Sequence, residues 1–323
     1  MDRLRIGVIG AGVLGSYHIG KCLKNPDVSL VGFYDSAPSR QAAVKEQFAV
    51  NAYDDMTALL AVCDAAIIAT PCSTHNETAL RSLAAGVHLL IEKPLAASYA
   101  EGFEIVRAAK KAGGVLHVGH SEAHGAAFGK LLSFHPVPRF IEIHRLAAYS
   151  PRGTDVSVIL DLMVHDLQLV HRLCKEEPVY EKIAATGVPV ISSGIDIASV
   201  RLPFPSGCVA NLTASRISAK RMRKIRIFAK DNYYSVDLDK SVIDRYFLES
   251  GSSPSEIPPV SFQTETVLPH DALECELQAF INAIKGAPHE QAVGGEEALI
   301  TLKISDVILK LIAGDSESSP QQV

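Results

Sequence analysis

The chain of 323 residues is 47% hydrophobic and 21% charged, a composition typical of a globular protein with about two domains. Its 31 basic and 36 acidic side chains give a net charge of −5, which argues against nucleic acid as a partner. We also expect no membrane partner, because no apolar run approaches the roughly 18 residues that a membrane span needs.

Six cysteines are scattered along the chain without any Cys-x-x-Cys pair. That spacing offers neither a zinc site nor a disulfide framework, so we predict no bound metal and a reducing compartment. The apolar stretch over 6–14 is interrupted by glycines, which is atypical of a signal peptide. Together these features predict a cytoplasmic protein.

The first 120 residues alternate short apolar runs with amphipathic stretches. Near-continuous Val, Ile and Leu runs flanked by helices are typical of a parallel sheet covered on both faces. The alternation therefore predicts a doubly wound α/β domain. We expect strands at Leu4–Ile9, Ser29–Tyr34, Val50–Tyr53, Ala65–Thr70, Val87–Glu92 and Val115–Gly119, and helices at Val13–Leu23, Pro38–Phe48, Ser73–Ala84 and Tyr99–Ala112.

After about residue 121 the pattern changes to runs with a period of two, separated by turn signals, which predicts a mainly antiparallel sheet. The expected elements are a helix at Asp161–Cys174, strands at Ile183–Val190, Ile195–Leu202, Cys208–Ser215, Lys224–Ala229 and Tyr233–Leu238, a loop at Ser250–Pro259, and helices at Asp271–Lys285 and Glu296–Ile312. We therefore expect one domain over 1–120, a second over 121–313 and a flexible tail over 314–323.

A G-x-G-x-x-G motif, Gly10-Ala11-Gly12-Val13-Leu14-Gly15, lies between the first expected strand and helix. In that setting Gly10 permits a tight turn, Gly12 lets a pyrophosphate approach the backbone, and Gly15 lets the helix pack on the strand. The N–H groups where the helix begins, at Val13 and Leu14, would face the phosphates. The alternative interpretation is a glycine-rich surface turn.

Asp35 ends the second expected strand, twenty residues after Gly15. A carboxylate there accepts hydrogen bonds from both ribose hydroxyls of a dinucleotide. Because a 2′-phosphate would be repelled, we predict NAD rather than NADP as the cofactor. Arg40 is a counter-argument, since an arginine can accommodate that phosphate.

Lys93 follows another expected strand in the sequence Glu92-Lys93-Pro94. Ligands of an open α/β sheet bind outside the carboxyl ends of its strands, and Pro94 restricts Lys93 to extended backbone geometry. The ammonium group could therefore bind a substrate hydroxyl and stabilise a developing alkoxide. The alternative is a solvated surface lysine.

Asp161 and His165 stand at positions i and i+4 of an expected helix, so they share one face. A histidine titrates near neutral pH and can take a hydroxyl proton while hydride leaves the same carbon. The pair could instead tie a helix to a loop. His165-Asp166 also suits a metal-dependent phosphohydrolase superficially, but the further His and Asp ligands on a helical scaffold are missing.

The stretch Val118-Gly119-His120-Ser121-Glu122-Ala123 resembles the G-x-S-x-G nucleophile elbow of hydrolases. Ala123 replaces its last glycine. A hydrolase would also leave the glycine-rich turn and Asp35 without a purpose, so we set this interpretation aside.

Taken together, the motifs resemble those of the Gfo/Idh/MocA family of nicotinamide-dependent oxidoreductases. They are, in family order, Gly10–Gly15, Asp35, Ala69-Thr70-Pro71 with His75, Glu92-Lys93-Pro94, Val118-Gly119-His120, and Asp161 with His165. The resemblance implies an N-terminal Rossmann domain and a C-terminal α/β domain with an open, mainly antiparallel sheet. It also implies a homodimer or homotetramer, and a last helix that packs back on the Rossmann domain.

The resemblance also implies roles for individual residues. Those around the nicotinamide and its ribose would be Thr70, Pro71, His75, Glu92 and Lys93. His165 would be the acid/base and Asp161 would position the substrate or the lysine, while a sugar secondary alcohol is oxidised to a ketone and hydride passes to the nicotinamide. Lys93 and His165 are thus expected to meet at one carbinol carbon.

Residues 140–145 and 150–163 are similar to family members that oxidise the 3-hydroxyl of UDP-N-acetylglucosamine. This similarity implies that His120 binds substrate and that Arg145 and Arg152 grip a diphosphate. The alternative is that both arginines are ordinary surface or ion-paired residues. Ala123 and His124 stand where many relatives carry Arg-Phe, which bears on specificity.

Two other functions stay open beside a sugar dehydrogenase. One is a non-catalytic NAD(P)-binding regulator, although a mere binder would need none of Lys93, Asp161 and His165. The other is a glycoside hydrolase that uses bound NAD in a redox-neutral reaction. Net accumulation of NADH distinguishes a dehydrogenase from such a hydrolase.

Overall fold

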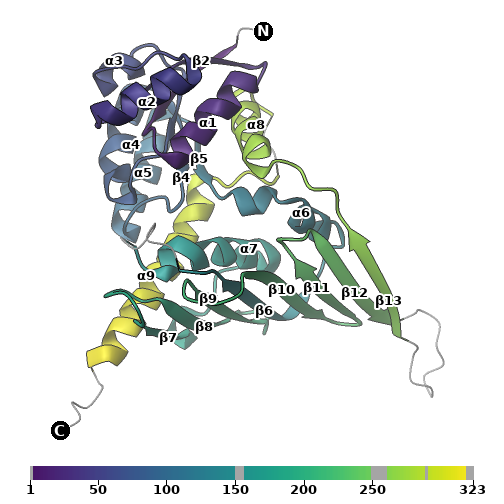
Figure 1. Ribbon diagram of the computed structural model, residues 1–323. Helices are drawn as coiled ribbons and strands as arrows, with labels where there is room; N and C mark the ends of the chain where they lie inside the picture. Colours follow the sequence, from purple (N-terminus) through teal and green to yellow (C-terminus); the bar gives the residue numbers. More distant parts are fainter. Residues whose placement is uncertain (1–2, 150–155, 249–259, 288–289, 318–323) are drawn as a thin grey trace. The chain divides into compact units, whose positions relative to one another are not determined.

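The computed structural model describes residues 3–149, 156–248, 260–287 and 290–317, and Figure 1 shows its ribbon. The chain divides into two compact units. Unit 1 consists of Met1–His124 and Asp271–Leu302, and unit 2 of Gly125–His270 and Lys303–Val323. Residues 271–302, which the sequence pattern assigned to the second domain, thus belong to unit 1. Every helix in the described part of the chain is too short or too polar to span a lipid bilayer.

Unit 1 contains a parallel five-stranded sheet in the order β2-β1-β3-β4-β5. Its strands are β1 (Leu4–Ile9), β2 (Val28–Tyr34), β3 (Ala65–Ile68), β4 (His88–Glu92) and β5 (Leu116–Gly119). Its helices are α1 (Val13–Lys24), α2 (Pro38–Phe48), α3 (Met56–Leu60), η1 (Cys72–Thr74), α4 (His75–Ala84), α5 (Tyr99–Ala112), η2 (Ser121–His124) and α8 (Ala272–Ile284). This topology confirms the predicted doubly wound α/β fold.

One expected strand of unit 1 does not form. Val50–Tyr53 meets β2 only at a single parallel bridge between Phe33 and Ala52 before the chain turns into α3. The parallel sheet therefore has one strand fewer than the apolar runs predicted.

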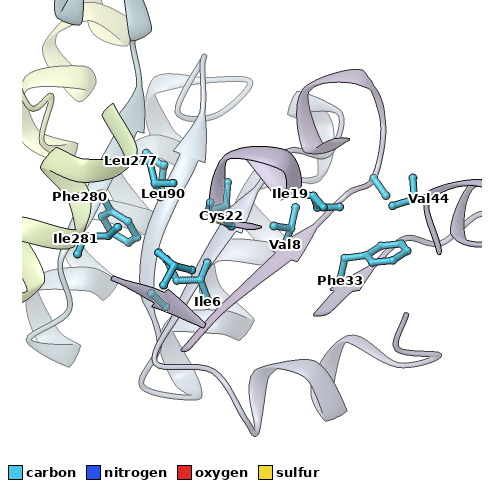
Figure 2. Close-up of a cluster of buried hydrophobic side chains, with 14 residues drawn as sticks. Ile6, Val8, Ile19, Cys22, Phe33, Val44, Leu90, Leu277, Phe280 and Ile281 are labelled. Carbon is cyan, nitrogen blue, oxygen red and sulfur yellow. The ribbon is translucent and has the colours of Figure 1, made fainter. Parts of the chain in front are cut away.

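The core of unit 1 is one buried cluster of side chains from the sheet and its helices (Figure 2). The labelled members are Ile6, Val8, Ile19, Cys22, Phe33, Val44, Leu90, Leu277, Phe280 and Ile281. Burial raises the pKa of the Cys22 thiol to about 12, so Cys22 packs as a neutral group. Because three of these residues come from α8, a segment late in the chain completes the core.

Unit 2 contains an eight-stranded sheet in the order β13-β12-β11-β10-β6-β9-β8-β7. Its strands are β6 (Pro138–Leu146), β7 (Ala184–Val188), β8 (Ile197–Pro203), β9 (Val209–Ser215), β10 (Met222–Ala229), β11 (Asn232–Asp237), β12 (Val242–Leu248) and β13 (Val260–Thr266). Only β6 and β9 pair in parallel among these strands. The sheet confirms the mainly antiparallel prediction.

Helices of unit 2 pack on one face of this sheet (Figure 1). They are α6 (Ala126–Ser133), the π-helical turn η3 (Ile159–Met163) and α7 (Val164–Cys174), and the short η4 (Tyr180–Lys182) precedes β7. Along β6, the buried Ile141, Ile143 and Arg145 face these helices, whereas the side chains between them are half-exposed. One face of the sheet is therefore built as a core.

The long helix α9 (Gly295–Glu317) contributes its first turns to unit 1 and the rest to unit 2. In unit 1 it packs closely on α5, since a Cβ atom added to Gly102 would lie 2.8 Å from Leu302. Residues 314–317, expected in a flexible tail, continue this helix. The expected loop Ser250–Pro259 and the end of the tail, 318–323, lie outside the described residues.

Candidate active site

The glycine-rich turn between β1 and α1 has the shape that a pyrophosphate needs. Gly10 has φ +90°, and a Cβ atom there would lie 2.6 Å from the Ala69 carbonyl oxygen. A Cβ atom on Gly15 would lie 1.9 Å from the Gly10 carbonyl oxygen, so only glycine lets α1 pack this closely. A Cβ atom on Gly12 would meet nothing nearer than the Arg40 side chain at 4.0 Å. Gly12 therefore borders open space.

The first turn of α1 faces the same open space. Gly12 precedes the helix without a side-chain cap, so the N–H groups at its start are available to an anion. Val13 and Leu14 are 50% and 44% exposed. These residues suit a ligand that combines phosphates with an apolar surface, as a dinucleotide does.

Asp35 follows β2 and is only 5% exposed. One carboxylate oxygen accepts a hydrogen bond from the Ala11 N–H at 2.7 Å, and the other accepts one from the Ala37 N–H at 2.8 Å. Each oxygen keeps a further acceptor position. The exposed Arg40 guanidinium lies 3.7 Å from Asp35. The turn, the helix start and this fixed carboxylate together fit NAD.

His75 ties the turn after β3 to the turn after β4. Its ring nitrogens lie 3.0 Å from the Thr70 carbonyl oxygen and 2.9 Å from that of Pro94. The side chain is 1% exposed, and its burial lowers the pKa of His75, which keeps the ring neutral at neutral pH. The neutral ring has one N–H, so it donates to one of these two carbonyl oxygens and only packs against the other.

Glu92 occupies the buried end of β4, next to the half-buried Lys93. One of its carboxylate oxygens lies 2.8 Å from His18 Nε2, and the other accepts a hydrogen bond from the Lys93 N–H at 3.2 Å. Both His18 and Glu92 are more than nine-tenths buried. The His18–Glu92 pair therefore fixes the backbone of Lys93 through the hydrogen bond from the Lys93 N–H to Glu92. The motif search missed His18, whose signal was a histidine on the core-facing side of α1.

Glu276 of α8 is a second group that the motifs did not indicate. It is 2% exposed, and neither of its carboxyl oxygens has a hydrogen-bond partner. Burial, together with the charge of Glu92, raises the pKa of Glu276 well above its usual range, which favours the protonated form. Unit 1 thus contains a buried carboxyl group for which the neutral form is favoured.

In unit 2, Asp161 lies in η3 and His165 in the first turn of α7. The sequence pattern predicted one helix from Asp161, but the chain forms a π-helical turn from Ile159 before the α-helix begins. Between residues 158 and 170, all of them described, only Asp161, Leu162 and His165 are not buried. Both candidate catalytic residues are thus half-buried, and their shared face and catalytic roles stay predictions.

Of the candidate substrate-binding residues, Arg145 is placed differently from what the resemblance implied. Arg145 is 2% exposed, and its guanidinium bonds to both carboxylate oxygens of Asp166 at 2.7–3.0 Å. Because β6 alternates, Arg145 points to the helix side of the sheet and is an ion-paired core residue, which makes the expected contact with a diphosphate wrong. Arg152 lies outside the described residues.

The short turn η2 contains the departure from the family pattern. Ala123 and His124 are both buried there, and His120 just before it is 2% exposed. An imidazole this deeply buried presents little surface to a substrate, so direct contact by His120 stays a prediction. Within the described residues, no three His, Cys, Asp or Glu side chains converge as a metal site would require.

Comparison with known proteins places these features in context. A profile of the Gfo/Idh/MocA oxidoreductase family, with an NAD-binding Rossmann fold, matches residues 4–120. UDP-N-acetylglucosamine 3-dehydrogenase from Acidithiobacillus ferrooxidans is 37% identical over 285 residues, which are 88% of this chain and 90% of that protein. A solved structure of the latter enzyme superposes with a TM-score of 0.90 at 34% identity, covering 97% of this chain and 99% of its own. Myo-inositol 2-dehydrogenase from Thermotoga maritima is 26% identical over 319 residues, 93% of each protein.

Proposed function

Since the chain belongs to the Gfo/Idh/MocA family of oxidoreductases with an NAD-binding Rossmann fold, we propose that it oxidises a secondary hydroxyl of a sugar or nucleotide sugar. The observation that carries this proposal is that Asp161 and His165 are only half-buried, in a segment whose other residues, apart from Leu162, are buried. An accessible pair suits a group that exchanges a proton with a ligand.

In this proposal unit 1 binds NAD and unit 2 binds the sugar. Gly10, Gly12 and Gly15 admit the pyrophosphate, and Asp35 accepts hydrogen bonds from the ribose. Thr70, Pro71 and Glu92 border the nicotinamide half, with His75 as their support. The Asp35 carboxylate disfavours a 2′-phosphate, which is why we propose NAD rather than NADP.

The catalytic roles fall to Lys93, Asp161 and His165. The Lys93 ammonium donates a hydrogen bond to the reacting hydroxyl and stabilises its developing negative charge. His165 takes the hydroxyl proton as general base, while Asp161 orients the sugar. Bound NAD supplies the hydride acceptor. The chain thus aligns the atoms and handles the proton.

As the specific reaction we propose oxidation of the 3-hydroxyl of UDP-N-acetylglucosamine. The support is the identity of 37% over most of both chains to the enzyme named for that activity. Inositol 2-dehydrogenases, at lower identity, favour a second candidate substrate in the cyclic polyol myo-inositol. Both candidates present a secondary ring hydroxyl.

The test is to incubate the purified protein and NAD with UDP-N-acetylglucosamine, other UDP-sugars, free sugars and myo-inositol, and to follow absorbance of the reduced nicotinamide. We expect net NADH with UDP-N-acetylglucosamine at a kcat/KM well above that for the other compounds. Turnover of myo-inositol alone would overturn the proposed substrate. Release of a free sugar without net NADH would favour the redox-neutral hydrolase, and NAD binding without any turnover would favour the regulator.

We also propose a cytoplasmic homodimer or homotetramer. All six cysteines are free thiols, which suits a reducing compartment.

On the side of the sheet away from α6 and α7, neighbouring aromatic rings lie with centroids 4.6–5.7 Å apart. They belong to Phe140, Phe228, Tyr233, Tyr246 and Phe262. A face of this kind suits a second copy, and light scattering of Phe228→Asp should then show a smaller particle than the native protein.

A further inference from the structure

A buried ion pair stands beside the segment that carries the candidate catalytic residues of unit 2. Arg216 follows β9 and is 4% exposed, and Asp196 precedes β8 and is 0% exposed. The Arg216 Nε–H donates to Asp196 Oδ1 at 2.9 Å. Moving two charges out of water is costly, so such a pair persists only where further hydrogen bonds complete it.

Asp196 is held by the loop that leads into its own strand. Its Oδ2 accepts hydrogen bonds from the N–H groups of Val190, Ile191 and Ser192 at 2.7–2.9 Å. The Ser192 hydroxyl donates to Oδ1 at 2.6 Å. These donors keep the pKa of Asp196 far below its usual range. The carboxylate is therefore a fixed negative charge to which Arg216 is oriented.

The other branches of the Arg216 guanidinium reach two separate segments. Its Nη2 donates to the Ser192 hydroxyl at 3.1 Å, and its Nη1 donates to the Val156 carbonyl oxygen at 2.9 Å. The adjoining backbone is tied in the same place, because the Val158 N–H donates to the Ile195 carbonyl oxygen at 3.2 Å. Arg216 thus links the end of β9, the loop before β8 and residues 156–158.

Residues 156–158 determine where the π-helical turn η3 begins. The Asp161 N–H donates to the Ser157 carbonyl oxygen at 2.9 Å, so a shift of Ser157 moves Asp161 with it. A π-helical turn is rare and concentrated at functional sites. Bonds from outside the helix, such as the one from Arg216 to Val156, are what can hold its entry in place.

We propose that Arg216 and Asp196 are positioning residues for the reaction: they fix the entry of η3 and so the placement of Asp161 and His165. This inference rests on the proposed function, because only the proposed function assigns catalytic roles to Asp161 and His165. A planar guanidinium can hold three hydrogen-bond partners at fixed angles, whereas a lysine ammonium is a compact point charge without that fixed geometry.

The experiment compares Arg216→Lys, which keeps the charge and loses the fork, with the control Arg221→Lys. Arg221 forms an exposed ion pair with Asp239 in the same unit, at 2.7 Å. We expect Arg216→Lys to lower kcat with UDP-N-acetylglucosamine by about 10–100-fold, because small misplacements of reacting groups carry such costs. The dissociation constant for NAD should not change. Amide hydrogen exchange at Val158 and Asp161 should accelerate, and the control should alter none of these.

Ser192→Ala provides a milder variant if Arg216→Lys does not fold. It removes one hydroxyl that bonds to both charges, so we expect a smaller loss of kcat and faster exchange at the same two amides. Wild-type kcat in a folded Arg216→Lys or Ser192→Ala variant would overturn the proposal. So would a weakening of NAD binding that matches the loss of kcat, since it indicates general damage.

A parallel measurement on His165→Ala separates this proposal from the proposed function. If His165→Ala retains wild-type turnover, the catalytic assignment fails and the positioning proposal fails with it, whatever the exchange data show. If His165→Ala is slow while Arg216→Lys is not, only the positioning proposal fails.

Discussion

The two units hold their candidate functional residues by different means. Around the glycine-rich turn of unit 1 the backbone shapes the site, because glycines without side chains leave room for a ligand and N–H groups of the turn fix Asp35. In unit 2 buried ion pairs hold the segments that carry the candidate residues. Arg145 bonds to Asp166 of α7, and Arg216 bonds to Asp196 and to Val156 before η3. Backbone cradles tolerate changes of neighbouring side chains, whereas ion pairs fail when either partner is lost.

The largest expected effect is that of His165→Ala in unit 2. Removing a general base should slow hydride transfer about 10²–10⁴-fold, while NAD binding is unchanged. Single-turnover absorbance and a separate NAD titration measure the two quantities. His171→Ala is the matched control, because His171 lies on the same helix and bonds to the Glu176 carbonyl oxygen. A wild-type rate in His165→Ala would assign the proton to another group.

In unit 1, Asp35→Ala should weaken NAD binding about 10–100-fold, because hydrogen bonds to a charged group contribute roughly 1.5–3 kcal/mol. Titration calorimetry measures the dissociation constant. Asp64→Ala serves as control, since Asp64 pairs with Arg5 in the same unit at 2.6 Å. Equal NAD affinities for Asp35→Ala and the native protein would remove Asp35 from the cofactor site.

Two glycines of the same turn should give opposite results. Gly15→Ala places a Cβ atom 1.9 Å from a carbonyl oxygen, so we expect a loss of stability of about 1–3 kcal/mol or more. Gly12→Ala meets open space, so its stability should stay within about 0.5 kcal/mol of the native value, while NAD binding weakens. Thermal unfolding and calorimetry test both. A Gly12→Ala variant with native NAD affinity would contradict the assigned pyrophosphate position.

The smallest expected effect is a change in the pH dependence of stability in Glu276→Gln. The pKa of Glu276 is raised in the folded protein, so the folded state binds this proton more tightly than the unfolded chain. The resulting stability is complete below the unfolded pKa and is lost as pH rises toward the folded pKa. The native melting temperature should therefore fall between pH 5 and 8 relative to that of Glu276→Gln.

A matched control for this measurement is Glu274→Gln, because Glu274 lies on the same helix with its side chain 63% exposed. Its melting temperature should follow the native curve. Parallel curves for the native protein and Glu276→Gln would show that Glu276 is ionised in the fold.

The sequence predicted what depends on local pattern. The alternating apolar runs located every strand of the parallel sheet of unit 1. Alternation along β6 also contained a signal that was not used: Ile141, Ile143 and Arg145 follow a period of two, which places Arg145 on the core face. The apolar pattern predicted neither this strand nor α6, β12 and β13.

What depends on distant partners could not be predicted from one sequence. His18 and Glu92 are separated by 74 positions, and Arg216 and Val156 by 60. No local sequence pattern predicts that the two residues of either pair are in contact. Glu276 looks like an ordinary helical glutamate until the packing of α8 against unit 1 buries it. The start of η3 at Ile159 was missed because a π-helical turn has no pattern of its own in the apolar spacing.

The packing of Leu277, Phe280 and Ile281 into the core of unit 1 also determines when this unit can form during synthesis. Once a ribosome has made the first 124 residues, the glycine-rich turn and all five strands of the unit 1 sheet have been synthesised, yet the apolar surface that α8 later covers is still bare. The nascent chain must carry that surface until nearly nine-tenths of its length has been translated, since α8 ends at Ile284 of 323 residues. Such an interval favours binding by chaperones. Early termination after His124 would thus yield an aggregation-prone fragment and no separate nucleotide-binding module.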